Sequence, residues 1–260
     1  MSSSGINITE EEVNQQAEAE ILDEARDVAS SLEVTLQQVR TGGTDPKDAL
    51  ARMSGDVSNI RLKAKSVNVP GLTAITHRLE EYMSSVKELD DKAIGDLQTY
   101  SDKISSLLDG ESVDVSEIAE VVRSMPHHST FNVEDIEIDI KEVVLVVPQK
   151  IAGKVVAREL EACGYRVTTI MDPFDAIALI MELKPDMIMT SMVLPRMSGA
   201  DLACALSAMP STKHIPVTAL TSLEPSHPDM RALPVNVGVV RRGPNFGDDL
   251  AQVLSKFQIT

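Results

Sequence analysis

Ser191 is a candidate nucleophile in this chain. It ends the apolar run MIMTS, which has the composition of a buried strand, and the following segment MVLPRMSG has the character of a loop that leads into a helix. A serine hydroxyl is not ionised, so it attacks an electrophile only when a base accepts its proton. Ser191 therefore needs a partner from elsewhere in the fold before it can react.

A second spacing could position a water molecule. Asp56 and Asn59 place a carboxylate and an amide three residues apart in a helical stretch, a spacing that resembles the one by which some helical phosphatases orient a water. Glu11 and Asn14 have the same spacing, which shows how readily it arises. The pair is a hypothesis for hydrolytic chemistry and no more.

Metal chemistry is not favoured. His127 and His128 are adjacent in a loop segment with no third ligand beside them, and a site needs three or four ligands. Cys163 and Cys204 lie in probable helices without metal-ligand spacing, and we expect both thiols to pack as small apolar side chains. We therefore predict no bound metal and no cofactor.

The composition excludes several classes of function. The net charge is −16 and aromatic residues are only 3% of the chain, which argues against a nucleic-acid partner. No apolar run approaches the roughly 18 to 20 residues that span a bilayer. The N-terminus MSSSGINITEEE lacks a basic segment followed by an apolar one, so we expect no secretion signal and a cytoplasmic protein.

Two halves have different periodicities. Up to about residue 124, apolar residues recur every three or four positions, and the breaks Thr41-Gly42-Gly43, Pro70-Gly71 and Gly110 separate four long helices from one another and from a short fifth at 115–125. Helices joined by short loops bury their apolar stripes against one another, which predicts an antiparallel bundle over residues 1–125. A linker is expected over 126–141.

From about residue 142 onward, strand and helix patterns alternate five times. The β-branched run at 143–147 is typical of a strand buried on both faces, and RVTTI, MIMTS, PVTAL and NVGVVRR follow it with helical stretches between them. This alternation predicts an α/β domain over 142–260, with a doubly wound, five-stranded parallel sheet. Pro225, Pro228 and Pro234 leave room for only a short fourth helix in it.

The segments VVLVVPQK, CGYRV, KPDMIMTSMVLPRMSG and STKHIPVTALTS, followed by the final helix, resemble the receiver domain of two-component response regulators in order and spacing. The resemblance covers nearly all of 142–257 and implies the flavodoxin-like receiver fold. It also implies an aspartate that accepts a phosphoryl group at the end of the third strand, an acidic pair after the first strand that holds Mg²⁺, a Thr or Ser after the fourth strand and a Lys after the fifth.

This sequence departs from that pattern at most of these positions. Ser191 stands at the acceptor position, Thr221 is retained, and the acidic pair and the lysine are replaced, by Pro148 and Gln149 and by Gly243 or, with a slip of one residue, Arg242. Arginine holds phosphate but is not equivalent to lysine. We therefore expect a receiver-like domain that does not form an aspartyl phosphate.

Residues 58–83 resemble the second and third helices of histidine phosphotransfer domains, most closely the five-helix domain of chemotaxis kinases. In that family the phosphorylated residue follows the pattern His, two residues, Lys, Gly. Here Ser58, Arg61 and Leu62 stand at those positions, and a serine has no imidazole nitrogen to carry the phosphoryl group. We expect His77, on the next helix, to be a packed or half-buried residue.

The same stretch of the bundle offers a candidate interaction patch, which comprises Asp56, Asn59, Arg61, Leu62, Lys63 and Lys65. Its cations lie in an otherwise acidic half, so they could complement the acidic pocket of another receiver. An ordinary charged helix face is an equally good interpretation.

Three functions follow from these observations. The first is a non-catalytic adaptor that binds a histidine kinase, a phosphotransfer protein or a response regulator without carrying phosphate. The second is a phosphatase that acts on a phosphorylated receiver through Asp56 and Asn59. The third is a structural or localisation protein.

Overall fold

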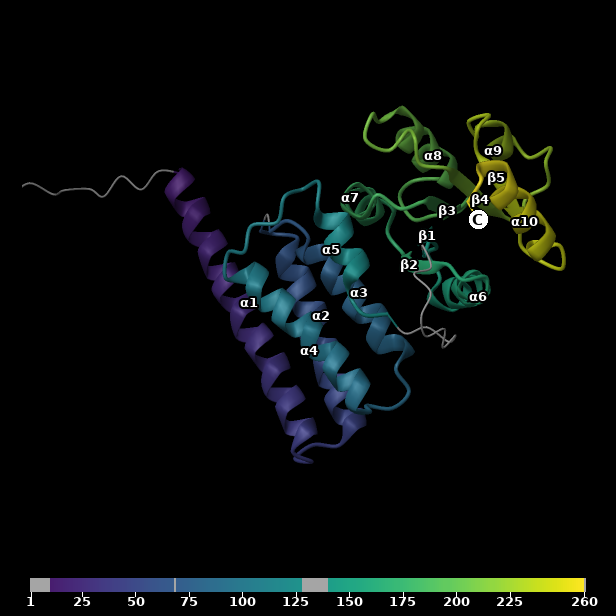
Figure 1. Cartoon of the computed structure of the whole chain (residues 1–260). Helices are drawn as coiled ribbons and strands as arrows, with labels where there is room; N and C mark the ends of the chain where they lie inside the picture. Colours follow the sequence, from purple (N-terminus) through teal and green to yellow (C-terminus); the bar gives the residue numbers. More distant parts are fainter. Residues whose placement is uncertain (1–9, 68, 128–139, 260) are drawn as a thin grey trace, which may run out of the picture. The chain divides into compact units, whose positions relative to one another are not determined.

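The computed structural model describes residues 10–67, 69–127 and 140–259. The chain divides into two compact units, Met1–His128 and Ser129–Thr260, and each is described by itself. Figure 1 shows the helical unit in purple to teal and the α/β unit in green to yellow. Of the expected linker over 126–141, residues 128–139 lie outside the described residues.

The first unit is helical throughout. Its helices are α1 (Glu10–Arg40), α2 (Pro46–Ala64), α3 (Leu72–Ser85), α4 (Asp91–Leu108) and α5 (Ile118–Ser124). Asp45 caps α2 by accepting a hydrogen bond from the amide of Lys47, with Pro46 in the first turn, and Asp90 caps α4 through the amide of Ala93. The five predicted helices are therefore confirmed.

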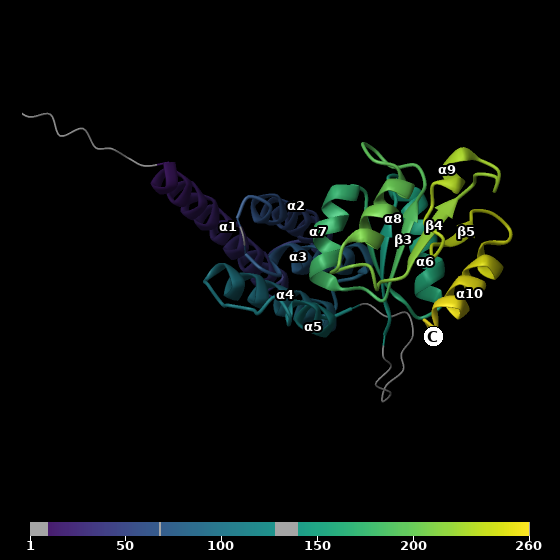
Figure 2. The same cartoon turned by 90° about the horizontal axis from the view of Figure 1, so that it is seen from above.

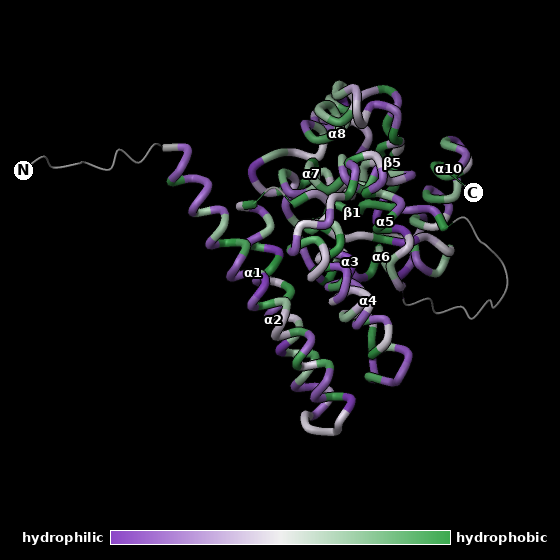
Figure 3. Tube along the Cα trace, turned by 60° about the vertical axis from the view of Figure 1, so that its left-hand side comes forward, coloured by the Kyte–Doolittle hydropathy of each residue, from purple (hydrophilic) through white to green (hydrophobic). Residues whose placement is uncertain are grey.

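The predicted apolar stripes face one another in this unit. In Figure 3, hydrophobic and hydrophilic residues alternate along α1 and α2. Helix α1 packs against α2 and α4, and α3 packs against α2 and α4 in turn, which closes a four-helix arrangement. Ala25, Leu32 and Leu36 of α1 are buried together with Met53 and Ile60 of α2. Burial of such side chains stabilises the bundle by about 1.5 to 3 kcal/mol each.

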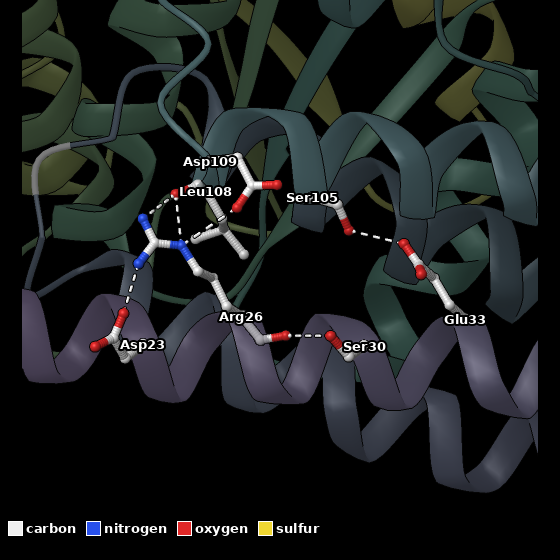
Figure 4. Close-up of polar contacts among 7 residues, drawn as sticks. All are labelled: Asp23, Arg26, Ser30, Glu33, Ser105, Leu108 and Asp109. Carbon is white, nitrogen blue, oxygen red and sulfur yellow. Dashed lines mark hydrogen bonds and ion pairs between the residues drawn. The ribbon is translucent and has the colours of Figure 1, made fainter.

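Polar contacts tie α1 to the end of α4 (Figure 4). The Arg26 guanidinium donates to the carbonyl of Leu108 from Nε at 3.1 Å and from Nη2 at 2.7 Å, and it pairs with Asp23 at 2.6 Å. Ser105 of α4 donates to Glu33 of α1 at 3.1 Å. The last carbonyls of a helix have no partner within it, so Arg26 supplies a donor and a positive charge where α4 needs both.

The second unit is a five-stranded parallel sheet in the order β2-β1-β3-β4-β5. Its elements are β1 (Glu142–Val146), α6 (Lys150–Ala162), β2 (Arg166–Ile170), α7 (Pro173–Leu183), β3 (Met187–Ser191), α8 (Gly199–Ala208), β4 (Val217–Thr221), α9 (Pro228–Arg231), β5 (Gly238–Arg241) and α10 (Phe246–Phe257). The predicted fold is confirmed, and so is the short fourth helix of this unit, α9.

Helices cover both faces of this sheet. Figure 2 shows α6 and α10 on one face and α7 and α8 on the other. Val143, Leu145 and Val147 pack with residues of α6 and α10 in one core cluster. Every residue of β1, β3 and β4 is buried, so these strands carry mostly apolar residues with small hydroxyl side chains and show no alternation of buried and exposed positions.

The cysteine prediction is wrong. Cys163 and Cys204 are both free and exposed. Cys163 is the C-cap residue of α6. Cys204 follows the buried residues Leu202 and Ala203 in α8 and lies on the solvent-exposed face of that helix. The usual burial of a free thiol does not apply at either position.

Among the described helices, none has the length and apolar character to cross a membrane.

Candidate functional site

Three candidate residues stand at the ends of neighbouring strands, at the carboxyl edge of the sheet. Ser191 ends β3, Thr221 ends β4, and Arg242 follows the last residue of β5. The strand register pairs Ser191 with Leu220 and Thr221 with Arg241, so Thr221 lies one residue beyond the level of Ser191 and Arg242 one residue beyond that of Thr221. The amide of Arg242 donates to the carbonyl of Thr221 at 2.8 Å, which extends the ladder by one residue and fixes the start of the arginine side chain.

Arg242 is the partner of Ser191. Its Nη2 donates to Ser191 Oγ at 3.3 Å, while Ser191 is only 5% exposed. The sequence left Gly243 and Arg242 as alternatives for the position after β5, and the side chain that reaches Ser191 is that of Arg242. Gly243 has a φ of +130°, a backbone conformation that favours glycine, and turns the chain away from the strand.

The guanidinium of Arg242 is incompletely compensated. Within the described residues, its Nε is buried without a hydrogen-bond partner, and no carboxylate pairs with it. Burial lowers the pKa of the Arg242 guanidinium from its ordinary value. An arginine nevertheless stays protonated in proteins, so the site holds a partly desolvated positive charge.

Pro148 and Gln149 lie at the adjacent end of β1. Pro148 is half-buried, and Gln149 is exposed at the N-cap of α6, where its side chain makes no capping hydrogen bond. Neither residue has a carboxylate for a hard cation, whose preferred ligands are oxygens. Across the parts of the chain that the structure describes, no group of three or more His, Cys, Asp or Glu side chains is placed to hold a metal ion.

Gly199 allows the start of α8 to approach the end of β3 closely at the same edge. A Cβ atom built on it would lie 2.2 Å from the carbonyl oxygen of Ser191 and 2.9 Å from Cα of Met192. Ser198 and Asp201 form a capping box that starts α8 at this point, and the amide of Gly199 donates to the carbonyl of Met192 at 2.9 Å. The glycine in the motif PRMSG therefore lets α8 begin in contact with the end of β3.

An ion pair that the sequence did not reveal lies at this edge too. Asp172, at the end of β2, caps α7 through the amides of Phe174 and Asp175 and pairs with Arg196, which stacks over the Phe174 ring at 4.7 Å. Burial alone would raise the pKa of the Asp172 carboxyl, but hydrogen bonds from Arg196 and from the two amides outweigh it and lower that pKa. Arg196 has a φ of +65°, so the loop is fixed in an uncommon conformation.

In the helical unit, Ser58 is part of a polar network between α2 and α3. Its hydroxyl donates to Glu80 Oε1 at 2.9 Å, and Arg61 Nη1 lies 3.1 Å from the other oxygen of Glu80. The same Arg61 nitrogen lies 3.5 Å from Nδ1 of His77. His77 is 7% exposed, so it is the packed histidine that was expected. The sequence did not indicate Glu80, because its partners lie 19 and 22 residues away on another helix.

Some residues of the candidate interaction patch contact α1, and another contacts α3. Asp56 accepts a hydrogen bond from Ser31 of α1 at 2.9 Å, and Lys63 pairs with Glu24 of the same helix. Arg61, with Glu80, is directed toward α3 instead. Two of the expected cations are thus paired with carboxylates inside the bundle, and the patch is less basic than its sequence suggests.

The other residues of the patch lie on the solvent-exposed face of α2 and at its C-cap. Asn59 and Lys65 are exposed, and Leu62 has 67% of its surface exposed. Single exposed leucines are ordinary on protein surfaces, so this exposure alone does not mark a contact surface.

Comparisons with known proteins concern the second unit. Residues 143–239 match the family described as response regulator receiver domain. The polar-differentiation response regulator DivK of Brucella anthropi is 30% identical over 82 residues, which are 32% of this chain and 67% of that protein. The response regulator PleD of Caulobacter vibrioides is 36% identical over 66 residues, 25% of this chain, and the match spans only 14% of PleD's length.

Solved receiver structures also align with this unit. The receiver domain of the sensor histidine kinase PA1611 from Pseudomonas aeruginosa is 20% identical, with a TM-score of 0.42, over 46% of this chain and 98% of that one. The chemotaxis response regulator CheY4 of Vibrio cholerae is 22% identical, with a TM-score of 0.40, over 45% of this chain and 98% of that one. Through its second unit, the chain belongs to the response regulator receiver family.

Proposed function

We propose that this protein is a non-catalytic adaptor of a two-component pathway, which binds a histidine kinase, a phosphotransfer protein or a response regulator in the cytoplasm and does not itself carry phosphate. The observation that carries the proposal is the hydrogen bond from Arg242 to Ser191, at the strand end where the family places its phosphoryl acceptor. The acceptor position holds a neutral hydroxyl whose neighbour is a cation.

The chemistry of this site supports the proposal. Ser191 needs a base before it attacks phosphorus, and Arg242, which stays protonated and only donates hydrogen bonds, cannot accept its proton. Phosphoryl transfer also relies on a metal ion to neutralise the charge on the transferring group. Pro148 and Gln149 offer no carboxylate for Mg²⁺, so both the nucleophile and the metal ligands of the aspartyl-phosphate reaction are replaced.

The helical unit supports the same proposal. Ser58, which stands at the phosphotransfer position in the resemblance, is hydrogen-bonded to Glu80, and Arg61 neutralises that carboxylate. A serine beside a carboxylate that is already paired has no imidazole for a phosphoramidate. Binding, by contrast, requires only a complementary surface, and our candidates for it are the exposed residues Asn59 and Leu62 of α2 and Lys65 at its C-cap.

Capture from the cells that produce the protein tests the adaptor role. The tagged full-length chain is cross-linked gently, and the captured proteins are identified by mass spectrometry. Enrichment of histidine kinases, phosphotransfer proteins or response regulators is expected, and a Leu62→Glu variant should reduce it while Val34→Glu, an exposed apolar site on α1, should not. If no two-component protein is enriched, the proposal fails.

A phosphatase is the second candidate, because Asn59 is exposed and the neighbouring Asp56 is held in place by Ser31. The test is the lifetime of a phosphorylated receiver mixed with this protein. A phosphatase would shorten that lifetime and lose the effect on Asn59→Ala. Asn14→Ala is the matched control, because Asn14 is exposed and follows Glu11 at the same spacing. An adaptor leaves the lifetime unchanged in all cases.

A further inference from the structure

The exposed face of α6 combines apolar side chains with a row of cations. Ile151 and Val155, one turn apart, have 82% and 59% of their surfaces exposed. Beside them, Lys150, Lys154 and Arg158 recur every four residues, and all three are exposed. Residues with this spacing lie on one side of a helix, so the three charges form a row along the apolar pair. Helix α6 therefore presents a surface to solvent that is both hydrophobic and basic.

This row of cations is unfavourable for α6 taken alone. Like charges at i and i+4 repel each other on a helix, and cations in the first turn oppose the helix dipole, while α6 has no acidic residue in its first turn. Among the described residues, no carboxylate forms an ion pair with Lys150, Lys154 or Arg158. Arg158 has an electrostatic interaction with Glu161, so the two lysines are the least compensated charges. A partner that carries negative charge along a line would stabilise this surface.

The first turns of α1 have the complementary character. Residues 10–24 contain seven carboxylates and no cation. Every residue from 11 to 20 is exposed, and Figure 1 and Figure 3 show that this end of α1 extends beyond the neighbouring helices of its unit. Val13, with 53% of its surface exposed, shares one face of the helix with Ala17 and Glu20, because the three recur at i, i+4 and i+7. This segment is an acidic helix with an apolar edge.

The same turns of α1 lack stabilising contacts of their own. Most helices in proteins are stabilised by the packing of an apolar face, and isolated helical segments shorter than about 12 to 15 residues are marginal in water. None of residues 11–20 is even half-buried, although they continue the helix that Ala25 and Leu32 anchor in the bundle. A partner that covers Val13 and neutralises the neighbouring carboxylates would supply contacts that this end of α1 does not have.

We propose that the protein self-associates through these two surfaces, with the first turns of α1 from one copy lying along α6 of a second copy. The exposed apolar pair of α6 packs against Val13 and Ala17, and the cations beside it face the carboxylates of α1. A second copy is the occupant that the observations favour, because the chain itself carries both complementary surfaces. Two copies that exchange these helices reciprocally form a symmetric dimer.

The inference goes beyond the adaptor role and does not rest on it. The adaptor proposal concerns partners of another kind and assigns their binding to exposed residues of α2, so a monomeric protein would leave it unchanged. Conversely, self-association should persist in the Leu62→Glu variant that tests the adaptor role.

Sedimentation equilibrium of the full-length protein tests the inference. The weight-average mass is measured at increasing concentrations up to about 1 mM, the weak end of specific association. We expect the mass to rise from that of one chain toward that of two. Lys154→Glu should weaken this association about tenfold, because it replaces attractions with repulsions. Lys213→Glu is the matched control, because Lys213 is exposed elsewhere in the same unit and its reversal changes the net charge equally.

A mixture of two variants shows whether the contact joins different chains. Lys154→Glu and Glu20→Lys should each associate weakly alone. In an equal mixture, one contact has the original charges and the other has them exchanged, so association should recover. A contact within one chain would give no recovery, because each chain would keep its own mismatch.

A further variant tests the apolar part of the surface and serves if a charge reversal does not fold. Ile151→Ser should weaken association, because it removes an apolar side chain from the contact. Val235→Ser, at a fully exposed position of the same unit, should associate as the wild type does.

Three results would overturn the inference. One is a wild-type protein that stays monomeric up to about 1 mM. Another is equal weakening by Lys154→Glu and Lys213→Glu, which would mean that association responds to net charge and not to the row on α6. The third is a mixture of Lys154→Glu and Glu20→Lys that associates no better than either variant alone, which would exclude α1 of a second copy as the occupant.

Discussion

Replacement of Gly199 by alanine should destabilise the α/β unit strongly, although the residue lies in the first turn of a helix. The added Cβ would lie 2.2 Å from the Ser191 carbonyl oxygen and 2.9 Å from both Ser191 C and Met192 Cα. All three neighbours are backbone atoms, so no side chain can rotate away. Overpacking costs about 1 to 3 kcal/mol, and an obstruction by backbone belongs at the upper end of that range.

Helix propensity partly offsets this cost. Alanine is favoured over glycine in a helix by about 1 kcal/mol, which leaves a net loss of about 2 kcal/mol in the free energy of unfolding. The matched control is Gly247→Ala in α10 of the same unit, where a Cβ would meet nothing within 4 Å. There the propensity acts alone, and the variant should be as stable as the wild type or up to about 1 kcal/mol more stable.

Urea unfolding of the full-length protein measures both variants, with methyl resonances of the second unit as the probe. With a slope of about 2 kcal/mol per molar urea, the midpoint of Gly199→Ala should fall by about 1 M. A midpoint equal to that of Gly247→Ala would refute the reasoning, because it would mean that α8 does not start in contact with the end of β3.

Three further predictions concern single contacts. Ser101→Ala should raise the free energy of unfolding of the helical unit by up to about 1 kcal/mol, because the Ser101 hydroxyl is buried and has no hydrogen-bond partner among the described residues. Ser105→Ala, which removes the hydrogen bond to Glu33, should not raise it. Urea unfolding of the helical unit distinguishes the two variants, and a lower free energy of unfolding for Ser101→Ala would contradict the prediction. Arg26→Gln should lower the free energy of unfolding by about 1 kcal/mol in the same assay, because it removes the hydrogen bonds to the Leu108 carbonyl. Arg40→Gln, at an exposed position on the same helix, should lower it little. Equal effects would show that the hydrogen bonds from Arg26 to Leu108 do not stabilise the unit. The pKa of the Asp172 carboxyl is lowered on folding, so this group stabilises the folded state above its ordinary pKa and loses that contribution as the pH falls through its folded pKa. Below about pH 4, the stability of Asp172→Asn should therefore depend less on pH than that of the wild type, as measured by thermal unfolding. An equal pH dependence in both proteins would contradict this prediction.

The elements of both units could be predicted from local patterns. The apolar stripe through Leu32 and Leu36 and the breaks at Gly42 and Gly71 are features of neighbouring residues, and so are the continuous strands 143–147 and 187–191. The position of Ser191 at a strand end follows from the same patterns, because the carboxyl ends of parallel strands share one edge of a sheet.

The partners of the candidate residues could not be predicted in this way. Whether Arg242 or Gly243 occupies the position after β5 that faces Ser191 depends on the register of β5 on β4, which the sequence alone does not give. The pairing of Lys63 with Glu24 and of Arg61 with Glu80 depends on how the helices face one another, so a cluster of cations in the sequence became two ion pairs in the fold. The exposure of Cys204 depends on the face of α8 on which it lies, and that of Cys163 on its position at the end of α6.

The measurement that tests the central claim most directly is the mass of the intact full-length protein after incubation with an autophosphorylated histidine kinase and, separately, with acetyl phosphate and Mg²⁺. A receiver that has an aspartate at its acceptor position is the positive control. The account predicts that the control gains a phosphoryl group and that this protein gains none. Stoichiometric phosphorylation of either unit, located by peptide mapping to Ser191, Ser58 or any other residue, would contradict it.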